Sequence, residues 1–334
     1  MRTIIIAVFL LLAVSLYPVP AIQLSGFSFL GGYYYPERED KEISYFDRQD
    51  IRFGITGLRS KPLVFEISLN YAEELLRDRL GLYSLFLVYQ TADTWSGSFQ
   101  IVDIGYGKPS EPFSRDLTDP EYDRYRLGNY RFQGIRFDHS LSSQFQASYR
   151  IGGNSHNTSI GTATLSFLLD PVTLDIFYLY TGRDNNLNKT MHSGGTELLV
   201  KSRCIQLRHA QSWQHLSSTF TTSNYISYGE LLWQITEGLQ AGSELFYAEQ
   251  LRGYRNWREL SFLTAYSWRK LMNTVQYSRT EAGNLKTARV TGIVTCSLSD
   301  SLSVGLNTGI HIPQVGDNYY SFGLQVKFNE KFPL

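Results

Sequence analysis

Histidine is the side chain in this sequence best suited to act as a base or a metal ligand. In the run Asn154–Asn157, Ser155 stands beside His156, the pairing that a serine nucleophile and its base require. We expect this run in a loop, and adjacent residues of an extended chain point to opposite sides. The run therefore does not predict a catalytic site. The histidines are His139, His156, His192, His209, His215 and His311.

Metal-binding patterns are equally weak. His209 and His215 are six residues apart, which is roughly 20 Å along an extended strand and too far for one metal ion. Cys204 and Cys296 stand outside any Cys-x-x-Cys or Cys/His cluster, and the sequence leaves open whether they form a disulfide. We predict no cofactor, no metal site and no enzymatic activity.

Charged residues are densest between Tyr106 and Leu127, which we interpret as the longest loop. Its acidic residues lack the spacing of an EF-hand, so calcium binding is not predicted. The charged residues of this loop are Lys108, Glu111, Arg115, Asp116, Asp119, Glu121, Asp123, Arg124 and Arg126.

Strict alternation of apolar and polar residues is the main structural signal. It is clearest in residues 63–71, 144–151, 302–311 and 319–328. A repeat of two places apolar side chains on one face and polar ones on the other, which predicts half-buried β-strands. No helical segment of convincing length is found, although residues 71–80 are compatible with a short amphipathic helical turn in a loop.

Connections between the expected strands alternate in length along the chain. Short turns are expected near 92–94, 140–142, 169–171, 237–239, 269–271 and 298–301, and longer loops near 36–45, 72–80, 106–127, 182–195 and 280–285. This pattern is typical of outer-membrane barrels, whose short turns face the periplasm. We predict one all-β domain over residues 22–334, a closed antiparallel transmembrane β-barrel of about 16 to 18 strands with both termini periplasmic.

The first 21 residues have the features of a cleaved secretory signal peptide. Arg2 supplies a positive charge, an apolar run extends to Tyr17, and Val19 and Ala21 are small residues at the −3 and −1 positions. The apolar run is shorter than the ~20 residues of a membrane-spanning helix. We therefore expect an exported protein, located in the bacterial outer membrane.

Composition and the last strand favour a membrane barrel over a soluble sandwich. Aromatic residues make up 14% of the chain and gather at the ends of expected strands, as in interfacial girdles. The segment Tyr319–Phe328 resembles the C-terminal signal strand of bacterial outer-membrane β-barrel, porin-like proteins, although residues 329–334 extend beyond it. The resemblance implies recognition by the barrel-assembly machinery through Tyr320, Phe322, Leu324, Val326 and Phe328.

A barrel of this size is too wide for side chains to fill, so a water-filled channel is expected. In general porins the third long loop folds into the lumen, and the resemblance implies this for residues 106–127. Both charge signs occur on the expected inner face, so strong ion selectivity is not predicted. By alternation, the charged residues that line the lumen are Arg52, Glu66, Arg150, Asp175, Glu230, Glu244, Arg289 and Lys327.

The leading functional hypothesis is an outer-membrane porin-like channel for passive diffusion of small polar solutes. The alternatives are a non-conducting barrel that serves as a scaffold or accessory of an envelope or secretion complex, a barrel hydrolase, and a soluble secreted β-protein. Expected partners are outer-membrane lipid, the assembly machinery and the solutes, and a homo-oligomer is left open. The formal net charge of +0 gives no reason to expect nucleic acid.

Overall fold

The structure, a computed structural model, describes most of the chain as β-strand. It covers residues 21–36, 43–56, 63–74, 77–92, 94–106, 127–153, 158–182, 190–217, 222–251 and 254–333, and β2, β3 and β4 are described by their backbone. No helix in these ranges is long and apolar enough to cross a membrane. Residues 1–20 of the predicted signal peptide and the loop 107–126 lie outside the described residues, so both stay predictions, whereas Ala21, the last residue of that peptide, is the first residue of β1.

The described chain contains 18 strands, the upper end of the expected range. They are β1 (Ala21–Tyr34), β2 (Ile43–Thr56), β3 (Leu63–Glu74), β4 (Arg77–Ala92), β5 (Trp95–Tyr106), β6 (Leu127–Ser140), β7 (Phe145–Gly153), β8 (Ser159–Leu169), β9 (Val172–Thr181), β10 (Thr190–Lys201), β11 (Ile205–Ser217), β12 (Thr222–Gln234), β13 (Leu239–Leu251), β14 (Tyr254–Trp268), β15 (Leu271–Ala282), β16 (Leu285–Ser297), β17 (Leu302–Pro313) and β18 (Tyr319–Pro333).

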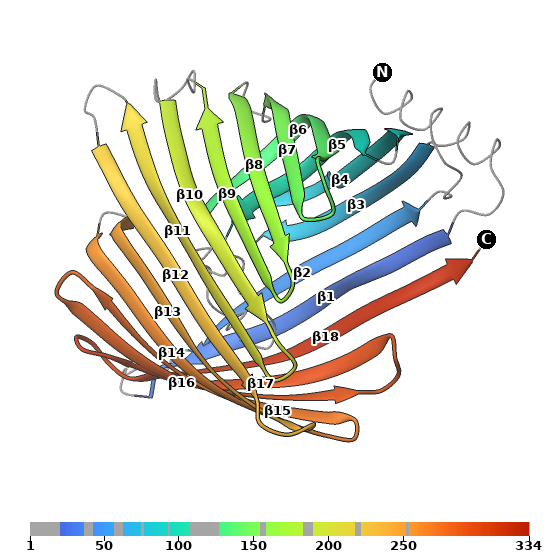
Figure 1. The fold of residues 1–334 in the computed structure, drawn as a ribbon. Helices are drawn as coiled ribbons and strands as arrows, with labels where there is room; N and C mark the ends of the chain where they lie inside the picture. Colours follow the sequence, from blue (N-terminus) through green and yellow to red (C-terminus); the bar gives the residue numbers. More distant parts are fainter. Residues whose placement is uncertain are drawn as a thin grey trace.

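Each strand pairs antiparallel with its neighbours in sequence, and the ring closes where β1 pairs with β18 (Figure 1). In this pairing Ala21 lies opposite Pro333 and Tyr34 lies opposite Tyr320. The closed ladder leaves no sheet edge among the described strands, which satisfies the requirement that backbone groups in lipid be paired. The predicted fold class is confirmed.

The two ends of the barrel differ in their connections. The first and last described residues, Ala21 and Pro333, lie at the end with short turns, such as the two-residue turns 170–171 and 269–270 (Figure 1). At the other end the turn after Ala282 is also short, because Gly283, at φ 60°, turns the chain in two residues. The longer loop expected at 280–285 is therefore wrong.

Two further sequence interpretations are also wrong. The loop and helical turn expected at 71–80 are not formed, because β3 extends to Glu74 and β4 begins at Arg77, in register with it. Residues 329–333 are no tail after the last strand. They continue β18 and pair with β1, so that Asn329 lies opposite Ser25.

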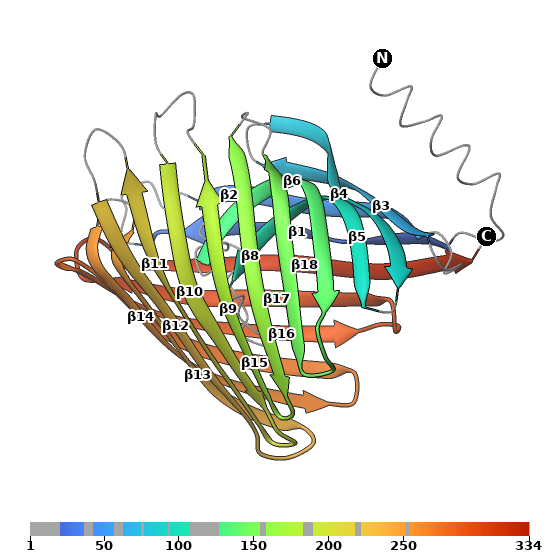
Figure 2. The same ribbon diagram turned by 45° about the horizontal axis from the view of Figure 1, so that its top comes forward.

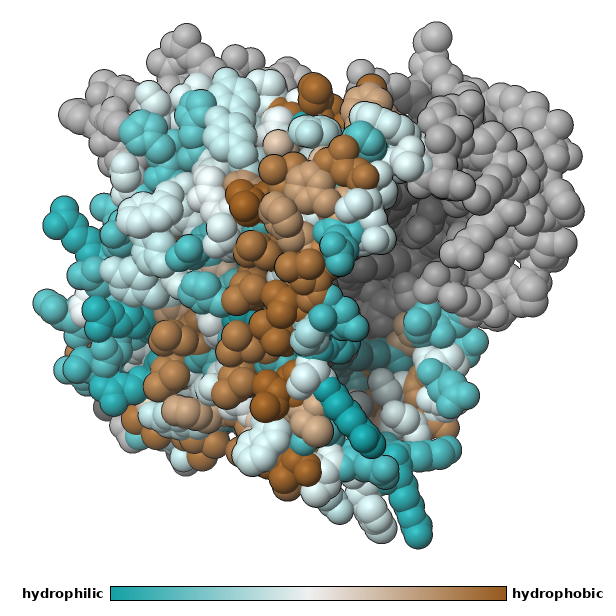
Figure 3. Space-filling view, in the orientation of Figure 1, coloured by the Kyte–Doolittle hydropathy of each residue, from teal (hydrophilic) through white to brown (hydrophobic). Residues whose placement is uncertain are grey.

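Burial is inverted relative to a soluble protein. On β15 the apolar Val275 is 56% exposed, whereas the polar Gln276 is 4% exposed. On β17 Leu306 and Ile310 are exposed, while Asn307 and His311 are buried. Figure 3 shows hydrophobic side chains gathered on the outer face turned to the viewer. An apolar outside with a polar inside is the pattern that a surrounding hydrocarbon phase requires.

Aromatic rings also lie on the outer face, near the end with the longer connections. Trp213, Tyr225 and Tyr247 stand on the consecutive strands β11, β12 and β13, with ring centroids 4.6 Å and 6.1 Å apart. The guanidinium of Arg258 on β14 lies 5.7 Å from the centre of the Tyr247 ring. Such a belt suits a membrane–water interface, where rings sit at the level of the lipid headgroups.

The inside of the barrel is not uniformly polar. Its walls face one another across the ring, with β8–β12 in front and β1, β17 and β18 behind (Figure 2). Toward the end with the longer connections, two clusters of buried apolar side chains lie on the inner wall. One contains Phe177, Phe246 and Trp257, and the other contains Phe132 and Leu179. The polar inner residues therefore dominate the middle of the barrel.

Consecutive residues of β15 test the assignment of the two faces. Val275→Arg should lower the free energy of unfolding by about 2–4 kcal/mol, because a guanidinium on the lipid face is poorly solvated. Gln276→Arg should cost much less, because its side chain points into the polar interior. Urea unfolding of the barrel in lipid vesicles, followed by tryptophan fluorescence, measures both. An equal loss for the two variants would contradict the assignment.

Candidate functional site

Glu230 and Glu244 lie directly opposite each other on β12 and β13. Both point to the inner face and are only 3% and 4% exposed. Neighbouring residues on the same strands, Leu231 and Leu245, are exposed on the outer face. The two-residue repeat thus brings two carboxylates together inside the barrel, where desolvation demands hydrogen-bond partners or water.

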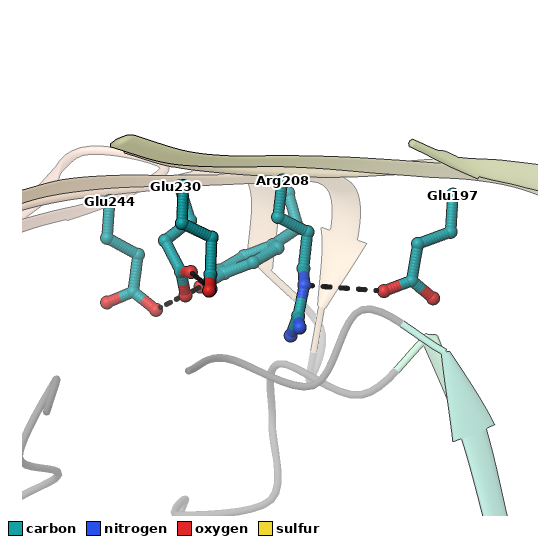
Figure 4. A network of polar contacts seen from close by, with 6 residues as sticks. Glu197, Arg208, Glu230 and Glu244 are labelled. Atoms are coloured by element: carbon teal, nitrogen blue, oxygen red, sulfur yellow. Dashed lines mark hydrogen bonds and ion pairs between the residues drawn. The ribbon is translucent and has the colours of Figure 1, made fainter. Parts of the chain in front are cut away.

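Glu230 and Glu244 belong to a larger group, which we call the acidic row: Asp175, Glu197, Glu230 and Glu244, with Arg208 between them. The row crosses five consecutive strands, β9 to β13, and its labelled members project from one face of the sheet (Figure 4). Asp175 lies opposite Glu197, and Arg208 lies opposite Glu230. Arg208 Nε is 3.5 Å from a carboxylate oxygen of Glu197. Four acidic side chains and one basic side chain give this sector of the wall a negative potential.

Tyr228 connects the two opposed carboxylates. Its hydroxyl lies 2.7 Å from Glu230 Oε2 and 2.9 Å from Glu244 Oε1, and Gln206 Nε2 donates to Glu230 Oε1 at 3.2 Å. A tyrosine hydroxyl has one proton, which it can donate to either carboxylate, so Tyr228 is the common hydrogen-bond partner of the pair.

The other lumen candidates are spread around the ring. Arg150 on β7 lies opposite Arg136, and Asp175 on β9 belongs to the acidic row. Arg289 on β16 lies opposite His311, and Lys327 is exposed in the middle of β18, opposite Ser303. Arg52 and Glu66 are on β2 and β3, whose side chains are not among those described. The structure brings together only Asp175, Glu230 and Glu244 of this set.

Sequence reasoning missed Glu197, Arg208 and Tyr228. The segment around Arg208 had no clear strand assignment, and β10 mixes glycine with apolar residues on both faces. Tyr228 and Glu230 share one face of β12, so alternation was a usable signal for them. The opposition of Glu230 and Glu244, in contrast, depends on cross-strand register, which local alternation does not reveal.

Most of the remaining candidate residues lie on the outer face of the barrel. Tyr320, Phe322 and Leu324 of the expected assembly signal are exposed there, and Val326 and Phe328 are half-buried. His209 and His215 are exposed on the outer face of β11. Cys204 and Cys296 are both free. Within the described ranges, no group of three His, Cys, Asp or Glu side chains could hold a metal ion.

A hollow on the outer surface lies over β15–β18. It is lined by Val275, Val290, Ile310 and Phe322, and by Gly292, which has no side chain to fill it. These side chains belong to the apolar outer face, so the hollow faces the membrane and not the solute path.

Several solved structures of other proteins have a similar fold. OccAB4 of Acinetobacter baumannii superposes with a TM-score of 0.61 at 10% identity, over 95% of this chain and 99% of that one. OpdK of Pseudomonas aeruginosa, solved with vanillate, gives 0.61 at 9% identity over 94% and 99%. OpdQ of Pseudomonas aeruginosa gives 0.58 at 12% identity over 95% and 98%.

These matches define the class of fold. OpdK is an outer membrane protein, and the chain has the fold of these matched proteins over nearly its full length. No sequence-family profile and no curated protein sequence matches the chain. At such low identity the likeness concerns the barrel, and the composition of the inner wall has to be taken from this chain alone.

Tyr228→Phe tests the shared hydrogen bonds of the carboxylate pair. The variant should lose about 1–3 kcal/mol of unfolding free energy, because two buried carboxyl groups lose their common partner. Glu244→Gln should cost little, because its amide can still hydrogen-bond to the Tyr228 hydroxyl. Unfolding in vesicles measures both variants. Tyr277→Phe, on the outer face, is the matched control, and a loss as large as that of Tyr228→Phe would argue against the role of the pair.

Proposed function

We propose that this protein is an outer-membrane channel for passive diffusion of small polar solutes. The observation that carries the proposal is the closed 18-stranded ring with an apolar outer face and a polar, charged inner wall. A barrel of 16–18 strands is wide enough for an aqueous path. The fold shared with OccAB4 and OpdK, of which the latter was solved with vanillate, supports a channel.

The inner wall further supports a preference for cations. The acidic row concentrates carboxylates on β9–β13, whereas Arg150 on β7 and Arg289 on β16 lie outside this sector. A potential of one sign along the wall of a low-dielectric channel raises the local concentration of counter-ions. The sequence alone predicted no strong ion selectivity. The register between strands places four acidic side chains in one sector of the wall, so we propose a preference for cations instead.

Export and assembly complete the proposal. Residues 1–21 would direct the chain across the inner membrane and be removed, and the outward residues of β18 would be recognised by the barrel-assembly machinery. The apolar outer face would contact outer-membrane lipid. β18 closes the ring by pairing with β1, which gives a physical reason for the last strand to be recognised during assembly.

Conductance across planar lipid bilayers tests the channel. Purified, refolded barrel should produce stepwise current increases in potassium chloride, and heat-modifiable migration on a denaturing gel should verify that the protein is folded. Folded protein that inserts but gives no current steps at any voltage would defeat the channel and favour the scaffold alternative.

Reversal potentials in a salt gradient test the cation preference. One carboxylate attracts a monovalent cation by about 0.6 kcal/mol, roughly a threefold enrichment, at ~10 Å with an effective dielectric constant of about 20 and salt screening. Glu197→Gln and the double variant Glu230→Gln/Glu244→Gln should each lower the cation-to-anion permeability ratio by up to about threefold.

The single variants Glu230→Gln and Glu244→Gln should each lower this ratio less than the double variant, because each leaves one of the two opposed carboxylates in place. Glu281→Gln is the matched control, since Glu281 pairs with Arg279 on the outer face at 2.8 Å. An anion-preferring wild type, or a control shift equal to that of Glu197→Gln, would reject the assignment.

A further inference from the structure

Three basic side chains stand together on the outer face, near the end with the longer connections. We call Arg258, Arg279 and Lys286, on β14, β15 and β16, the basic cluster. The register brings them together, because Glu281 on β15 lies opposite Arg258 on one side and Lys286 on the other, and Arg279 is two residues before it. Arg258 contacts the Tyr247 ring of the aromatic belt at 5.7 Å. The cluster therefore lies at the level of the lipid headgroups, where a cation on the outer face costs little.

The carboxylates of this face do not balance the basic cluster. Glu281 Oε1 is 2.8 Å from Arg279 Nη2 and 3.8 Å from Lys286 Nζ, and the two basic side chains remain 50% and 52% exposed. Glu249 on β13 accepts a hydrogen bond from the backbone of β12. Arg258 meets no acidic partner within the described ranges. Three cations thus face two carboxylates, which leaves positive charge for the phosphate groups of the membrane surface.

The apolar hollow over β15–β18 lies next to the basic cluster, toward the middle of the barrel. Its volume is about 670 Å³, within the range of small-molecule sites. Val275 and Val290 line it, and they are four residues from Arg279 and Lys286 on the same strands. Four residues of a strand span about 13 Å, and long basic side chains bend along apolar surface to reach polar groups. A headgroup and its acyl chain cover a span of this kind.

The hollow owes its depth to small residues in one cross-strand row. Gly292 lies opposite Val275 on β15 and opposite Thr308 on β17, and Thr308 lies opposite Phe322 on β18. A Cβ at Gly292 would meet Thr308 Oγ1 at 3.5 Å, an ordinary contact, so the backbone does not forbid a side chain here. The missing side chain leaves an apolar space that faces hydrocarbon, which suits an acyl chain.

We propose that the basic cluster and the hollow together form a binding site for one membrane lipid whose headgroup exposes a phosphate. The phosphate lies on the basic cluster, where arginine can offer two parallel donors, and an acyl chain lies in the hollow. A second copy of the barrel, related by an axis along the membrane normal, would bring its own basic cluster to the same level, where like charges repel. The inference rests on the proposed channel, because it takes the outer face to lie in a membrane.

Native mass spectrometry of the refolded barrel in neutral detergent tests the lipid site without requiring conductance. The probes are dioleoyl phosphatidic acid and dioleoyl phosphatidylcholine, which have the same acyl chains but differ in net charge. Wild-type protein should retain one molecule of phosphatidic acid and bind it at least about fivefold more tightly than phosphatidylcholine. Inorganic phosphate at the same concentration should not displace the lipid, because it cannot fill the hollow.

Charge variants test the headgroup half of the site. The double variant Arg258→Gln/Lys286→Gln should weaken binding of phosphatidic acid about tenfold or more, because each basic side chain near anionic headgroups contributes roughly fivefold. Glu281→Gln should tighten it, because Arg279 is then left to the phosphate. Lys201→Gln, exposed at the end with short turns, is the matched control and should leave binding unchanged.

Glycine variants test the acyl half. Gly292→Leu should fill the hollow and weaken binding about fourfold for each methylene group that it displaces. Gly229→Leu is the matched control, because Gly229 is on the outer face of β12 and a Cβ there meets nothing within 4 Å. Heat-modifiable migration verifies that each variant is folded.

Four results would overturn the lipid site: equal binding of the two lipids, unchanged binding in the double charge variant, displacement by inorganic phosphate, or a lipid-free barrel dimer that Gly292→Leu abolishes. The third would indicate a site for free anions, and the fourth would assign the hollow to a second copy. Failure of the channel is distinct. Lipid binding without conductance rejects the channel alone, and conductance without cluster-dependent lipid binding rejects the lipid site alone.

Discussion

The pairing of β1 with β18 is the constraint on which the rest of the structure depends. An open sheet of this length would present two rows of unpaired N–H and C=O groups, and each such group costs several kcal/mol in hydrocarbon. Closure removes both rows at once. Because Ala21 lies opposite Pro333, closure also brings the start of β1 and the end of β18 to the same rim, which fixes which connections lie on that side.

Closure separates two environments, and the two-residue repeat distributes the side chains between them. Val275 and Leu306 face outward, while Gln276 and Asn307 face inward. Charges that would be costly on the outside can therefore gather inside. The carboxylates of Glu197, Glu230 and Glu244 are held there by donors from Arg208, Gln206 and Tyr228.

The inner wall is divided into sectors of different chemistry. The acidic row occupies β9–β13, whereas Arg289 and His311 lie opposite each other on β16 and β17. Apolar clusters that include Phe177 and Phe132 line the wall toward the end with the longer connections. A solute crossing the barrel would thus meet apolar side chains first or last, and would pass between an acidic sector and one that carries an arginine and a histidine.

The sequence by itself determined the period of the strands, most of the tight turns and the all-β class, because these depend on interactions between residues close in the chain. Residues 71–80 show the limit, since glutamate, leucine and arginine favour a helix locally, but ladder pairing between β3 and β4 outweighs that preference. Only the tertiary structure decided that Glu230 faces Glu244, that Tyr228 lies between them and that Arg258 and Lys286 stand on either side of Glu281. These facts depend on the register between strands, which backbone pairing around the closed ring sets and which no local stretch of sequence specifies.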